Sequence, residues 1–103
     1  MSDDAAVEVG RVVDRLRSMP LTRLARPWGD YPSLAAGSRA LAQRLADRGA
    51  DLGGWPRRDV PDVGDAAVGD QVAVTARDLF ALSPSDDVLA EIAADLRDFR
   101  LSV

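Results

Sequence analysis

The stretch SPSDDVLAEIAADLRDFR, residues 83–100, indicates the fold class more clearly than any other part of the chain. Ser83 is a residue type that caps helices, Pro84 suits the first helical position, and Asp86 is favoured near the positive end of a helix. Apolar residues then recur at spacings of three and four, the period of one helix face: Val88, Leu89, Ile92, Leu96 and Phe99. The sequence therefore predicts a helix that begins after Ser83 and runs to about Arg100.

The N-terminal part of the chain carries a similar pattern. A helix is expected from about Asp3 to Ser18, and Pro20 ends it. Its apolar face consists of Val9, Val12, Val13, Leu16 and Met19. Residues 21–32 are rich in proline and glycine and are predicted to be irregular, with room for a short helical turn over residues 21–25.

A second long helix is predicted to begin at Ser33, a good N-cap, and to end at Gly49 or at Gly53-Gly54. Gly37 inside it is tolerated at a cost of about 1 kcal/mol relative to alanine. One side of this helix is expected to be buried through Leu34, Leu41, Leu45 and Leu52.

The longest loop, residues 53–64, separates this helix from the next one. The third helix is predicted to begin near Asp62 or Asp65, with both aspartates as helix caps. Residues 71–76 are rich in β-branched side chains, but a helical spacing outweighs that signal: Val68, Val72, Ala76, Leu79 and Phe80. Four amphipathic helices without a convincing strand predict an all-α fold, a four-helix bundle-like single domain over residues 1–103. Its long loop connects helices 2 and 3.

Cysteine, histidine and lysine are absent, and all thirteen basic residues are arginine. This bias, together with abundant Ala, Val, Gly and Asp, is typical of a high-GC bacterial genome. Disulfides and Cys/His zinc sites are impossible. So are a cysteine nucleophile, a histidine general base and a lysine Schiff base. We therefore do not expect an enzyme, and a carboxylate-dependent enzyme is kept as a third alternative.

Four aspartates in and after the long loop raise the question of a metal site: Asp59, Asp62, Asp65 and Asp70. Their spacing does not match a calcium loop, which needs acids at alternating positions, a central glycine and a terminal glutamate. The glycines nearby do not form a phosphate-binding motif. We therefore expect neither a metal nor a cofactor.

The N-terminus is acidic and has no signal-peptide pattern. No apolar run approaches the roughly 18–20 residues of a membrane span. The expected location is cytoplasmic, without membrane association.

The formal net charge is −4, so the protein is acidic, but the charge is uneven. Residues 1–58 hold ten Arg against seven acids, and residues 59–103 hold three Arg against ten acids. In the last helix one face is acidic: Asp87, Glu91, Asp95 and Asp98. This stripe could dock a basic partner. A solvated face is the simpler interpretation, and pairing with Arg11 and Arg15 of the first helix is a third.

The Arg-rich N-terminal half makes nucleic-acid binding the main alternative function. The acidic overall charge argues against it, because long-range steering would oppose DNA. A helix–turn–helix built through residues 82–84 would make the acidic last helix the recognition helix, which phosphates would repel.

Aromatic residues gather in two loops. Arg26, Trp28 and Tyr31 lie in one and Trp55 in the other. Such residues dominate interface hot spots, but in a chain with five aromatics they are more often buried as caps of the bundle. The leading hypothesis is a non-catalytic protein-interaction or accessory, regulatory module. It would bind a protein partner or self-associate, with Leu101 and Val103 as candidate apolar surface.

Overall fold

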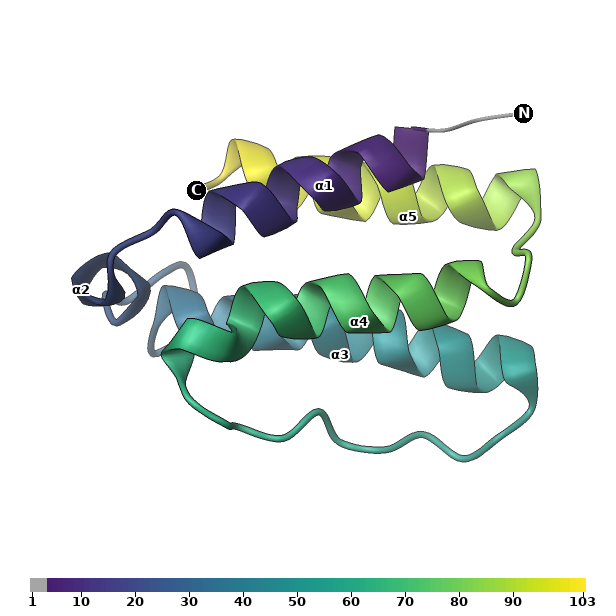
Figure 1. Cartoon of the computed structure of the whole chain (residues 1–103), viewed down its shortest axis with the longest axis horizontal. Coiled ribbons are helices and arrows are strands. Elements are labelled where there is room, and N and C mark those ends of the chain that lie inside the picture. Colours follow the sequence, from purple (N-terminus) through teal and green to yellow (C-terminus); the bar gives the residue numbers. More distant parts are fainter. Residues whose placement is uncertain (1–3) are drawn as a thin grey trace.

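A computed structural model describes residues 4–103 and confirms the predicted all-α bundle (Figure 1). The long helices are α1 (Asp4–Arg17), α3 (Leu34–Gly53), α4 (Val68–Phe80) and α5 (Asp86–Leu101). Two short elements join them, the helix α2 (Leu21–Leu24) and the 3₁₀ turn η1 (Asp65–Ala67). The described residues form no strand, only one isolated β-bridge between Trp28 and Tyr31. The start of the first helix predicted at Asp3 lies outside the described residues.

The four long helices surround one core. α1 packs against α4 and α5, and α4 packs against α3. The ring closes between α3 and α5, where Arg44 donates two hydrogen bonds of 2.9 Å to Asp95. The largest apolar side chains that are completely buried come from the three C-terminal long helices: Leu41, Leu45, Leu79, Ile92 and Leu96.

The long loop crosses the whole bundle because α3 and α4 run in the same direction (Figure 1). α3 has 20 residues and is therefore about 30 Å long. The chain must return over this length before α4 begins. The ten residues 55–64, which we call the strap, can reach at most about 36 Å when fully extended. The strap must therefore be extended, and it has no spare length to form a helix.

Two predicted helix ends are confirmed. The side chain of Ser33 caps α3 and accepts a hydrogen bond of 3.0 Å from Ala36 N. α3 ends at Gly53, and Gly54 follows with a φ of 76°. A left-handed φ of this kind is favourable only for glycine, which decides between the two predicted ends.

Three local predictions are wrong. Ser85, not Ser83, caps α5 and accepts a hydrogen bond of 3.3 Å from Val88 N. Ser83 has a φ of 52°, whereas an N-cap residue normally has an extended backbone. Neither predicted aspartate is a helix cap. The Asp62 carboxylate accepts from Gly64 N before any helical turn begins, and Asp65 is the first residue of η1, with Gly64 and Ala67 at the N-cap positions of η1 and α4. Leu52 is 47% exposed because it lies in the last turn of α3, at the end of the bundle.

Candidate functional site

Side chains from two helices hold the strap by its backbone. Gln43 of α3 accepts a hydrogen bond of 2.7 Å from Val60 N and donates one of 2.9 Å to Arg58 O. Gln71 of α4 donates a hydrogen bond of 2.7 Å to Pro61 O. These are the chain's only two glutamines. These two amides hold the strap backbone, while Arg57 binds Asp51 of α3 through its side chain and Val60 packs against the core.

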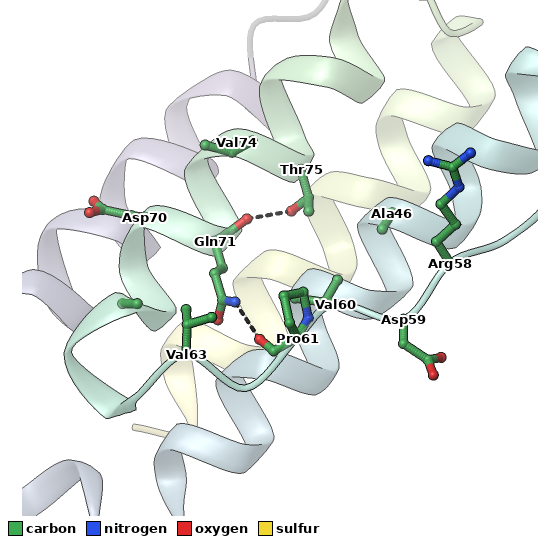
Figure 2. Close-up of a pocket in the computed structure, with 11 residues that line it drawn as sticks. Ala46, Arg58, Asp59, Val60, Pro61, Val63, Asp70, Gln71, Val74 and Thr75 are labelled. Carbon is green, nitrogen blue, oxygen red and sulfur yellow. Dashed lines mark hydrogen bonds between the residues drawn. The ribbon is translucent and has the colours of Figure 1, made fainter.

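A cavity of about 460 Å³ opens between the strap, α3 and α4 (Figure 2). We call it the strap groove. The surface exposed in it is almost wholly apolar, although five of its eleven lining residues have polar side chains. Ala46 of α3 lies on one side and Val74 of α4 on another. Val63 is 63% exposed and Val74 is 44% exposed. The remaining lining residues are Arg58, Asp59, Val60, Pro61, Ala67, Asp70, Gln71 and Thr75. The groove therefore leaves two valine side chains exposed to water.

A second hollow of about 300 Å³ extends the groove along the strap. It shares Ala46 and Arg58 with the groove and reaches Trp55, which is 48% exposed. The Trp55 ring lies so close over Gly53 that a Cβ at residue 53 would collide with it. Exposed apolar surface therefore follows the strap from Trp55 to Val63.

Buried polar atoms without hydrogen-bond partners gather beneath the far end of the strap. In the described part of the chain these atoms are Gln71 Oε1 and the Nε and Nη2 of Arg39. Arg39 Nη2 lies 3.1 Å from Asp62 Oδ1, so the pair attracts electrostatically without hydrogen-bond geometry. Because an unpaired buried polar group costs free energy, this end of the strap is less favourably packed than the helices.

Arg58 is one of few arginines left without a charged partner. Nine of the thirteen arginines pair with carboxylates of the chain, and Arg15 donates to Val103 O. Among the described residues, Arg23, Arg26 and Arg58 have no such contact. The next residue in the strap, Asp59, is also unpaired. Few guanidinium groups thus remain for phosphates, and one of them lines the strap groove.

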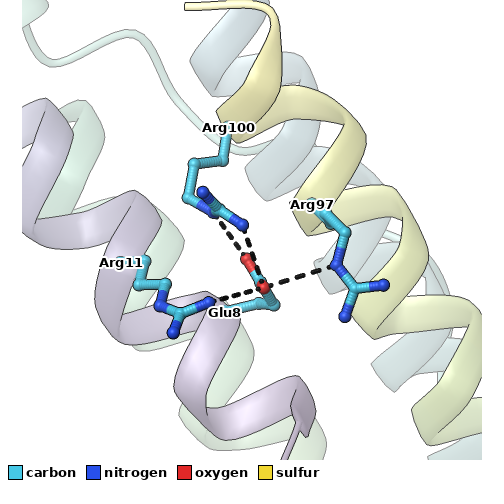
Figure 3. Close-up of polar contacts among 4 residues, drawn as sticks. All are labelled: Glu8, Arg11, Arg97 and Arg100. Atoms are coloured by element: carbon cyan, nitrogen blue, oxygen red, sulfur yellow. Dashed lines mark hydrogen bonds and ion pairs between the residues drawn. The ribbon is translucent and has the colours of Figure 1, made fainter.

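A second polar cluster lies where the first helix, α1, meets the last, α5 (Figure 3). Glu8 is 2% exposed. Its carboxylate accepts hydrogen bonds from Arg100 at 2.8 and 3.2 Å, from Arg11 at 3.2 Å and from Arg97 at 3.5 Å. The hydrogen bonds from Arg100 lower the pKa of Glu8, and burial raises it. The hydrogen bonds have the larger effect, so the pKa of Glu8 lies below its ordinary value. This cluster fastens α1 to α5.

The four acidic residues predicted as a stripe on the last helix lie on α5. Asp95 pairs with Arg44, and Glu91 pairs with Arg48 at 3.0 Å. Both arginines come from α3, so the complement is not the first helix. The hydrogen bonds to Asp95 raise the pKa of Arg44. Asp87 and Asp98 are exposed. Half of the stripe is therefore used to close the bundle.

The aromatic loop residues separate into two groups. Trp28 packs edge-on against Phe99 with a centroid distance of 5.1 Å, and its Nε1 donates a 3.1 Å hydrogen bond to Ser102 O. Tyr31 stacks on Trp28 and is 37% exposed. A Cβ at Gly37 would collide with the Trp28 ring. Trp28 thus caps this end of the bundle, whereas Arg26 is exposed beside it and Trp55 lies far along the chain on the strap.

The sequence did not point to the residues that form the strap groove. Val63 was part of a loop, and Val74 lies outside the buried face of its helix. One signal was present. Gln43 and Gln71, the only two side-chain amides in the chain, lie on the helices that flank the loop. Amides at such positions can bind loop backbone in place of a neighbouring strand.

Another groove, of about 420 Å³, lies between α1 and α4. Its most exposed apolar members are the small residues Ala6 and Gly10, whereas Val9 and Phe80 are half-buried. It therefore offers less apolar surface to a partner than the strap groove does.

None of the helices within residues 4–103 is both long enough and apolar enough to cross a membrane. In the same range, no group of three acidic side chains is placed to hold a metal ion. Comparison of the chain with protein-family models, with curated proteins and with solved structures finds no match.

Proposed function

We propose that the protein is a non-catalytic interaction module that binds a protein partner through the strap groove. The observation that carries the proposal is the groove itself. Its volume of about 460 Å³ exceeds the 420 Å³ of the groove between α1 and α4, its exposed lining is mostly apolar, and Val63 and Val74 stand in it exposed. Exposed apolar surface gathered in a concave site is typical of binding surfaces.

The chemistry of the groove favours binding over catalysis. Five of its eleven lining residues have polar side chains, and three of these already bond within the chain: Asp70, Gln71 and Thr75. The chain also has no histidine, cysteine or lysine to act as base or nucleophile. A partner that buries the two valines gains from removing apolar surface from water, at about 25 cal/mol per Å².

A matched pair of variants tests the proposal. Val74→Asp places a charge in the groove, and Val7→Asp makes the same change on α1, where the side chain has nearly equal exposure, 47% against 44%. Both variants should keep the circular dichroism of the native protein. Affinity capture from cells that make the protein, with quantitative mass spectrometry, should show partners that Val74→Asp loses and Val7→Asp retains. Capture of the same proteins by both variants would contradict the proposal.

A further inference from the structure

We propose that the strap groove binds an extended segment of the partner, which pairs with the strap as an added β-strand and places an acidic residue against Arg58. This inference rests on the proposed function, because it describes how the same groove is filled. It is carried by the direction of the strap's backbone groups, by the shape of the groove and by the unpaired charge of Arg58.

The contacts of the strap fix which way its backbone groups point. In extended chain the N–H and C=O of one residue point to one side, and those of the next residue point to the other. Arg58 O and Val60 N both bond to Gln43 on α3. The N–H and C=O of the residue between them, Asp59, therefore point away from α3. Pro61 O, which has the same direction, is bound by Gln71 of α4. The Asp59 groups thus face α4 across the groove.

This edge of the strap is free at Arg57 and Asp59, up to Pro61, whose carbonyl Gln71 occupies. Within the described residues, no hydrogen bond engages the backbone N–H or C=O of Arg57 or Asp59. Gln43 occupies the opposite edge, in the place that a neighbouring strand would take in a sheet. Pro56 and Pro61 bound the free edge, and prolines are typical of strand edges that must not pair at random. A short extended segment can add to such an edge through main-chain hydrogen bonds.

The groove offers room for the side chains of such a segment. In an added strand, alternate side chains point to the same face. One set would lie against Val74 and over Ala46, whose single methyl leaves space for a larger aliphatic group (Figure 2). An α-helix keeps its own backbone groups bonded and would leave the Asp59 edge unused. The free edge therefore favours an extended occupant.

Arg58 determines which charge we expect on the bound segment. Arg58 lines both the groove and the hollow next to it, and among the described residues its guanidinium has no ion pair, in a chain that pairs nine of its thirteen arginines. A carboxylate on the bound segment supplies the missing partner. The expected ligand is a peptide with aliphatic residues at alternate positions and an Asp or Glu beside them.

Selection of displayed random dodecapeptides on the immobilised protein tests this inference. Enriched peptides should show alternating aliphatic residues with an acid, and their affinity is then measured by fluorescence anisotropy. Val74→Asp and Arg58→Glu should weaken binding about tenfold or more, and Val7→Asp should change it less than about twofold. Methylation of the peptide's backbone nitrogens should weaken binding only at every second residue, since only those N–H groups face the strap.

The possible outcomes separate the mode of binding from the function. Peptides with helical spacing that still depend on Val74 would overturn the extended mode and leave the proposed function standing. Peptides that bind equally well to Val74→Asp would overturn both. The absence of any enriched peptide would overturn the extended mode, and capture of a folded partner remains the test of the function. Concentration-dependent dimerisation that Val74→Asp abolishes would make a second copy the occupant and overturn the inference.

Discussion

Where α1 meets α5, the buried carboxylate of Glu8 is surrounded by three arginines, whereas where the strap crosses α3 and α4, buried atoms of Arg39 and Gln71 have no hydrogen-bond partner. Both regions join separate elements with polar side chains, the first across about ninety residues of sequence and the second across ten to seventeen. The first region satisfies its polar groups, and the second does so only in part. Surfaces that bind ligands are drawn from the less stable parts of a fold, so the difference suggests separate roles for the two regions.

The largest expected effect is at Glu8. Glu8→Gln keeps the shape of the side chain and leaves three guanidinium groups around a neutral amide. We expect a loss of about 2–4 kcal/mol in the free energy of unfolding, because one member of a buried charged cluster is removed. Urea unfolding followed by circular dichroism measures it. The control is Glu91→Gln, whose exposed pair with Arg48 should contribute less than about 1 kcal/mol. Equal losses in the two variants would show that Glu8 does not fasten the helices.

The contribution of Glu8 to the free energy of unfolding should also depend on pH. The arginines, Arg100 first, lower the folded-state pKa of Glu8 from the ordinary 4.5. The stabilisation is therefore complete above about pH 4.5, where the unfolded chain is ionised, and is lost as the pH falls through the lower folded pKa. Unfolding free energies of the native protein and Glu8→Gln, measured from pH 7 to pH 3, should converge at the acidic end. A constant difference would contradict the assignment.

The strap should respond locally rather than globally. Gln43→Ala removes two hydrogen bonds to the strap backbone, worth about 1–2 kcal/mol together. Trypsin cleavage after Arg57 and Arg58 should then accelerate about tenfold, since 1.4 kcal/mol corresponds to a factor of ten. Cleavage at Arg11 and Arg15 of α1 should change much less. If all sites accelerate together, the strap does not open as a separate unit.

The same contrast separates what the sequence predicts from what it does not. Helix ends set by local chemistry were predictable, as at Ser33, where the capping bond joins residues three apart. The prediction that Ser83 caps α5 was wrong because Ser85 offers the same side chain two residues later. Which serine becomes the cap depends on how the connection from α4 bends. Apolar periodicity predicted most of each buried face for the same local reason, and Leu52 at the end of α3 was the exception.

The strap groove depends on information that no local pattern carries. A ten-residue connection can join α3 and α4 in parallel, as here, or fold into a slack loop between antiparallel helices. Val63 and Val74 become neighbours only in the first case. The Glu8 cluster could not be predicted from the sequence either, because its partners Arg97 and Arg100 lie about ninety residues away along the chain. Non-local pairing therefore set the limit of the sequence-based predictions.

The smallest expected effect is also the sharpest test of the comparison. Gln71→Met gives up one hydrogen bond to Pro61 O but also removes a buried acceptor, Oε1, that has no partner. The two changes oppose each other, so the free energy of unfolding should stay within about 0.5 kcal/mol of the native value. Gln43→Met is the matched control, because both atoms of that amide are bonded and its loss should be clearly measurable. If Gln71→Met destabilises as much as Gln43→Met, then Oε1 has a partner in solution. The strap would then be as well satisfied as the Glu8 cluster, and the distinction between a fastened and a less favourably held region would no longer stand.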